Sequence, residues 1–78
     1  MPSYAEILTY CTAELATILE VEAGNISPPD TFSGLGLDSA MAVHFVIAVE
    51  ERFGIELYPS VTEDYPNLDA FCAYLSSR

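Results

Sequence analysis

The chain has 78 residues, enough for one small domain and too few for the large α/β enzyme folds. Two basic residues against twelve acidic ones give a formal net charge of −10 at pH 7, which disfavours nucleic acid and anionic membrane surfaces as partners. Hydrophobic residues make up 51% of the chain and charged residues 18%, so a core is expected rather than a disordered acidic tail.

The sequence shows no pattern typical of export or of metal binding. No apolar run reaches the roughly 18 residues of a membrane span, and the N-terminus lacks the basic start of a signal peptide. Cys11 and Cys72 are too few for a disulfide framework, and no Cys/His cluster offers zinc ligands. We therefore expect a cytoplasmic, reduced protein without a metal site.

Residues 3–19 are predicted to form the first helix. Their apolar side chains recur at helical spacing, namely Tyr4, Ile7, Leu8, Cys11, Leu15, Ile18 and Leu19. Ser3 and Glu6 fit a capping box, in which the serine hydroxyl accepts from the Glu6 amide and the Glu6 side chain reaches back. Cys11 lies on the apolar stripe and is expected in the core.

Residues 20–38 interrupt this pattern with glycine and proline clusters and predict a long loop. So long a loop is unusual in a small domain and is often functional. We expect some of its apolar residues to fasten it to the helices, these being Ile26, Phe32, Leu35 and Leu37.

Residues 39–53 are predicted to form the second helix, with Asp38 or Ser39 as N-cap and Gly54 just beyond the C-terminal end. At about 100° per residue, one arc is expected to face the core, namely Ala42, Phe45, Val46, Val49 and Phe53. A second stripe mixes apolar and acidic residues, namely Ala40, His44, Ile47 and Glu51, flanked by Val43 and Glu50. This mixture favours a partner surface, although scattered exposed apolar residues are also normal.

The last third of the chain predicts one short helix and one longer helix. Ser60 and Glu63 fit a second capping box, and Pro66 ends that short helix near Tyr65. Asn67 is expected to cap the last helix, whose apolar residues are Leu68, Phe71, Cys72 and Leu75. The expected fold class is all-α, a small antiparallel bundle of three main helices plus one short helix, with the long loop between the first two.

Ser39 is the candidate residue for chemistry, because it follows a glycine-containing loop and opens a helix. It could be a simple N-cap, or a modified serine whose phosphate ester the positive helix end would stabilise. A catalytic nucleophile is disfavoured. The nucleophile elbow needs glycine where Leu37 and Met41 stand, and His44 lies about 140° around the helix from Ser39.

The segment Leu35-Gly36-Leu37-Asp38-Ser39 resembles the LGxDS attachment motif of acyl carrier proteins. Phe32 stands where that family has the first residue of F-x-x-L-G-x-D-S. Residues 48–57 are similar to the family's A-L-E-E-x-F-x-I-x-L continuation, and residues 64–67 to the D-Y-P-T stretch of polyketide-synthase carriers. The resemblance covers essentially the whole chain.

This resemblance implies that residues 1–78 are a single acyl carrier domain of the polyketide-synthase type. A phosphopantetheinyl transferase would attach 4′-phosphopantetheine from coenzyme A to Ser39, beside Asp38, and the arm would carry acyl groups as thioesters. The monomeric protein would catalyse nothing itself and would deliver its cargo to an acyltransferase, a ketosynthase or other synthase enzymes with basic docking surfaces. The docking residues would be Ala40, Met41, Val43, His44, Ile47, Glu50 and Glu51.

Two positions depart from the family pattern. The family usually has leucine directly after the serine and often glutamate five residues after it, where this chain has Ala40 and His44. Both lie on the expected docking stripe, so they bear on the identity of the partner rather than on attachment. Two alternatives stay open, an aminoacyl or peptidyl carrier and an unmodified acidic helical module that binds a basic protein surface.

Overall fold

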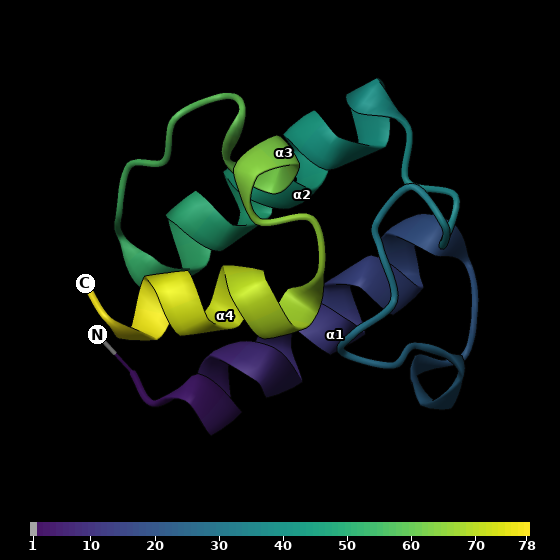
Figure 1. The fold of residues 1–78 in the computed structure, drawn as a ribbon, viewed down its shortest axis with the longest axis horizontal. Coiled ribbons are helices and arrows are strands. Elements are labelled where there is room, and N and C mark those ends of the chain that lie inside the picture. Colours follow the sequence, from purple (N-terminus) through teal and green to yellow (C-terminus); the bar gives the residue numbers. More distant parts are fainter. Residues whose placement is uncertain (1) are drawn as a thin grey trace.

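The structure, a computed structural model, describes residues 2–78 and is built from helices joined by loops (Figure 1). Its elements are α1 (Tyr4–Leu19), the short 3₁₀ helix η1 (Ala23–Asn25), α2 (Ser39–Phe53), α3 (Val61–Asp64) and α4 (Leu68–Ser76). Within residues 2–78 the chain forms no strand, and a single isolated bridge pairs Thr31 with Asn67. No helix in the described range is both long and apolar enough to cross a membrane.

The helices are arranged as the sequence predicts. α4 packs along α1 and runs in the opposite direction, so the start of α1 and the end of α4 lie on the same side of the molecule (Figure 1). α2 returns across α1 after the long loop, and the short α3 precedes α4. The prediction of an all-α bundle with three main helices and one short helix is therefore confirmed.

Local capping explains where the main helices begin and end. The amide of Glu6 donates to Ser3 Oγ at 3.2 Å and the Ser3 amide donates to Glu6 Oε1 at 3.4 Å, which confirms the first capping box. Asn67 Oδ1 accepts from the Ala70 amide at 2.8 Å and caps α4 as expected. α2 ends at Gly54, whose φ of 64° is left-handed and suits glycine.

The predicted second capping box at Ser60 and Glu63 is wrong. Ser60 has φ −93° and ψ 16°, so its backbone is not extended as an N-cap with a bonding side chain usually is. The Glu63 amide therefore donates to the backbone carbonyl of Ser60 at 2.9 Å instead of to its hydroxyl.

Three phenylalanines from distant parts of the chain meet in the core. Phe45 of α2 and Phe71 of α4 are fully buried, with ring centroids 5.3 Å apart. Phe32 of the long loop is 4% exposed, and its ring centroid lies 5.8 Å from that of Phe45 and 6.1 Å from that of Phe71. Three of the four predicted loop anchors, Ile26, Phe32 and Leu37, are buried, and Leu35 packs against the core.

Both cysteines are free and fully buried, as expected for core residues. A side-chain hydrogen bond with Cys72, followed by burial, raises the pKa of the Cys11 thiol, so it stays protonated. The two thiols therefore act as small apolar side chains where α1 packs on α4.

Phe53 differs from its predicted place on the core face of α2. It is only partly buried, and its ring packs edge-on against Tyr10 of α1 at a centroid distance of 5.5 Å. The guanidinium of Arg52 lies 5.4 Å from the centre of the same tyrosine ring. Phe53 is the last residue of α2, so it packs at the rim rather than in the centre of the bundle.

Candidate functional site

The long loop is fastened to the start of α4 before it reaches Ser39. The Asp69 amide donates to the Pro28 carbonyl at 3.1 Å, and the Phe32 amide donates to the Pro66 carbonyl at 2.8 Å. The Leu37 amide then donates back to the Phe32 carbonyl at 2.9 Å. These bonds and the buried anchors fix the chain direction just before α2 begins.

Asp38 and Ser39 form the start of α2. Asp38 Oδ1 accepts from the Met41 amide at 2.9 Å, so Asp38, not Ser39, is the N-cap. Ser39 is the first helical residue and is exposed, which leaves its hydroxyl accessible. The first amides of a helix lack intrahelical partners, and together with the helix dipole they favour a negatively charged group at this end.

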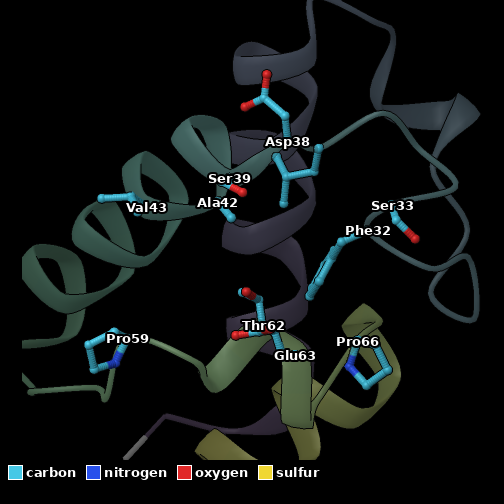
Figure 2. Close-up of a pocket in the computed structure, with 11 residues that line it drawn as sticks. Phe32, Ser33, Asp38, Ser39, Ala42, Val43, Pro59, Thr62, Glu63 and Pro66 are labelled. Atoms are coloured by element: carbon cyan, nitrogen blue, oxygen red, sulfur yellow. The ribbon is translucent and has the colours of Figure 1, made fainter.

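Ser39 opens onto a groove of about 520 Å³ between α2 and α3 (Figure 2). Ser39 and Ala42 on α2 face Thr62 and Glu63 on α3 across this groove. The full set of lining residues is Phe32, Ser33, Leu37, Asp38, Ser39, Ala42, Val43, Pro59, Thr62, Glu63 and Pro66.

The far wall of the groove depends on the short helix α3. Val61 is fully buried and anchors α3 to the core. The Tyr58 hydroxyl donates to Asp64 Oδ2 at 2.8 Å, and this hydrogen bond is the main reason why the pKa of Tyr58 is raised to about 12. Sequence reasoning missed Thr62 and Glu63 as groove residues, because nothing in their local pattern indicates which helix they face.

The predicted docking stripe lies mostly on the exposed side of α2. Val43 is 58% exposed and Ile47 is 48% exposed, and the other exposed members are Ala40, His44 and Glu51. Met41 is partly buried and packs against the core. Glu50 is also partly buried, and its Oε2 accepts from the Leu57 amide at 2.8 Å. Glu51 is thus the freer of the two neighbouring carboxylates.

Charge is unevenly distributed along this face. Residues 39–48 contain no carboxylate, so the side chains that α2 itself presents after Ser39 are apolar except for His44. Carboxylates stand at its two ends, Asp38 before the helix and Glu51 near its C-terminal end. No group of three or more His, Cys, Asp and Glu side chains within residues 2–78 could hold a metal ion.

Comparison with known proteins places this chain in a family. Residues 12–75 match the PP-binding family, described as the phosphopantetheine attachment site. An acyl carrier protein from Helicobacter pylori (strain G27) is 33% identical over 67 residues, which cover 85% of this chain and 86% of that protein. Polyketide synthase PksL from Bacillus subtilis (strain 168) is 31% identical over 65 residues, which cover 83% of this chain and 1% of the synthase.

A solved structure supports the same assignment. The crystal structure of a free-standing peptidyl carrier protein from Acinetobacter baumannii superposes with a TM-score of 0.91 at 31% identity, covering 96% of this chain and 94% of that chain. Carrier proteins of this kind are generally non-catalytic. The chain therefore belongs to the family of phosphopantetheine-bearing carrier proteins.

Proposed function

We propose that residues 1–78 form one acyl carrier domain and that 4′-phosphopantetheine is attached to Ser39 Oγ. The observation that carries this proposal is the placement of Ser39, which is exposed at the first turn of α2 and opens onto the groove of about 520 Å³. Other serines of the chain, such as Ser3 and Ser60, lie at helix starts without lining this groove.

The residues around Ser39 fit such a group. The Asp38 carboxylate accepts the Met41 amide and points away from α3 (Figure 2), which leaves the groove beside Ser39 open. The amides of the first turn favour a phosphodiester on Ser39 Oγ. When bound, the arm supplies a terminal thiol to which an acyl group is joined as a thioester. This chain's own part is to hold the ester and to offer the groove and the α2 face.

Partner enzymes are proposed to dock on α2. Their basic surfaces would meet Asp38 and Glu51 and would contact the apolar patch of Val43 and Ile47 between these charges. We propose a phosphopantetheinyl transferase as the modifying enzyme and an acyltransferase, a ketosynthase or another synthase enzyme as later partners. The likeness to PksL favours polyketide biosynthesis as the setting. In this proposal the carrier acts as a monomer and catalyses nothing itself.

Intact mass tests the attachment. The unmodified protein is incubated with coenzyme A and a promiscuous phosphopantetheinyl transferase, and one phosphopantetheinyl increment is expected. Ser39→Ala removes the only attacking oxygen in this proposal, so the increment should disappear. Ser33→Ala is the matched control, because Ser33 is also exposed and lines the same groove. An increment that persists in Ser39→Ala, or a folded wild type that takes none, would contradict the proposal and favour an unmodified interaction module.

A second candidate is an aminoacyl or peptidyl carrier, which the likeness to the Acinetobacter baumannii peptidyl carrier favours. The two candidates differ in how the modified protein is loaded. A polyketide carrier accepts acyl groups from an acyltransferase. A peptidyl carrier instead accepts an aminoacyl group from the aminoacyl adenylate that an adenylation enzyme forms, and AMP is released as the thioester forms. The modified protein is incubated with each enzyme in turn, and the intact mass of the product shows which group has been loaded. The loaded group decides between the two candidates.

A further inference from the structure

Phe32 lies between the groove beside Ser39 and the interior of the bundle. Its ring lines the groove and points into the space between α2 and α3 (Figure 2). The same ring is 4% exposed and packs against Phe45 and Phe71, which are fully buried. One side chain therefore forms part of the groove wall and part of the core.

The backbone holds Phe32 firmly in this position. Its amide donates to the Pro66 carbonyl at 2.8 Å, and its carbonyl accepts from the Leu37 amide at 2.9 Å. The bridge between Thr31 and Asn67 fastens the preceding residue to the start of α4. These bonds fix the backbone of Phe32, and the packing of its ring against Phe45 and Phe71 then sets where the side chain lies.

The open path from the groove leads along the surface instead. A second cavity of about 160 Å³ is lined by Val43, Val46, Ile47, Glu50, Leu57 and Pro59. It shares Val43 and Pro59 with the first groove. Its lining is mainly apolar, and Val43 and Ile47 are 58% and 48% exposed, so a chain lying there stays at the surface.

We propose that Phe32 is a specificity-determining residue that closes the interior of the bundle to the cargo. The acyl group then lies in the surface groove and along Val43 and Ile47, not among the core side chains. This inference rests on the proposed attachment to Ser39. A smaller residue at position 32 would leave an apolar cavity that opens to the groove, and such cavities accept apolar guests.

The first test uses the unmodified protein and xenon, so it does not depend on Ser39. In wild type, xenon should leave the amide NMR signals of Phe45 and Phe71 unchanged. In Phe32→Ala both signals should shift saturably. Phe32→Leu keeps an apolar side chain at the site, so it serves if Phe32→Ala does not fold, and it should show the same effect more weakly. Xenon shifts of equal size in wild type and a folded position-32 variant would overturn the proposal.

The second test uses protein loaded with an octanoyl thioester on the arm. The wild-type melting temperature should match that of the unacylated arm-bearing form, and amide shifts should be confined to groove residues such as Thr62. In Phe32→Leu the octanoyl form should melt several degrees higher than its unacylated form, because the chain gains buried apolar contact. Phe53→Ala is the control, since it removes an equal ring outside both cavities.

The outcomes separate the two proposals. Octanoyl stabilisation of wild type, with shifts at Phe71, would overturn the role of Phe32 and leave the attachment intact. Failure of Ser39 to accept the arm would overturn the proposed function, while the xenon comparison would still decide whether Phe32 closes the interior.

Discussion

At the scale of single residues, Asp38 and Ser39 have different roles at the start of α2. Asp38 gives its carboxylate to the Met41 amide and so defines where the helix begins. Ser39 is then left with an exposed hydroxyl at the groove. The cap and the proposed attachment point are adjacent residues with separate functions, so substitutions should separate them.

Replacing Asp38 tests this division. Asp38→Ala removes the side-chain cap and should lower the free energy of unfolding by about 1 kcal/mol. Asp38→Asn keeps a capping oxygen and removes the charge, so it should stay close to wild type in stability. Urea unfolding followed by circular dichroism measures both. Equal losses in the two variants would mean that the charge, rather than the hydrogen bond, is the stabilising feature.

At the scale of elements, α3 is the part of the fold that depends most on its surroundings. A helix as short as Val61–Asp64 is not stable alone in water, because its nucleation is unfavourable. Three contacts hold α3 in place. Val61 is buried, and the Tyr58 hydroxyl donates a hydrogen bond to Asp64. The rings of Tyr65 and Tyr74 stack with their centroids 4.4 Å apart. Since α3 forms the far wall of the groove, these contacts also shape the site.

The hydrogen bond of Tyr58 predicts a pH dependence. The hydrogen bond to Asp64 favours the neutral phenol of Tyr58 in the folded protein. It raises the pKa of Tyr58 from 10.0 to about 12. The contribution of this hydrogen bond to the free energy of unfolding is present below pH 10 and is lost as the pH rises through about 12. The stability difference between wild type and Tyr58→Phe should therefore shrink over that interval, as measured by urea unfolding at several pH values.

Other tyrosines do not confuse this comparison. Tyr4, whose hydroxyl donates to Asp69 and whose pKa is also raised to about 12, is present in both proteins and cancels in the difference. A difference between wild type and Tyr58→Phe that stays constant up to pH 12 would show that the bond does not stabilise the fold.

At the scale of the whole molecule, negative charge dominates the surface. The formal net charge is −10, and the two arginines are engaged within the fold. Arg52 lies over the Tyr10 ring, and Arg78 Nη1 donates to the Glu56 carbonyl at 3.0 Å. The negative electrostatic field attracts basic partners toward the molecule, and the apolar patch on α2 provides a surface that they can contact.

Reversing one charge tests whether this field guides docking on α2. Glu51→Lys and Glu22→Lys both change the net charge from −10 to −8, and both residues are exposed. Only Glu51 lies on α2, so Glu51→Lys should lower kcat/KM for modification by the transferase more than Glu22→Lys at low salt. The gap should narrow at high salt, because salt screens exposed charges. Equal losses in both variants, at every salt concentration, would mean that α2 is not the docking face.

Features that depend on neighbours in the chain could be predicted from the sequence. The three main helices, the caps at Ser3 and Asn67, and the place of Ser39 at the start of α2 follow from spacing and local hydrogen bonding. The sequence left Asp38 and Ser39 as alternative caps of α2, and the structure selects Asp38. The capping box expected at Ser60 failed although its residues fit, because the local backbone takes another conformation there.

Features that join distant segments were decided only by the tertiary structure. Three such features depend on how whole helices pack. Phe32, Phe45 and Phe71 meet in the core. The Glu50 side chain accepts a hydrogen bond from the Leu57 amide, and Phe53 packs at the rim. The groove beside Ser39 is of the same kind, since α3 forms its far wall. Local spacing and capping thus place the serine at a helix start, but only long-range packing decides what surrounds it.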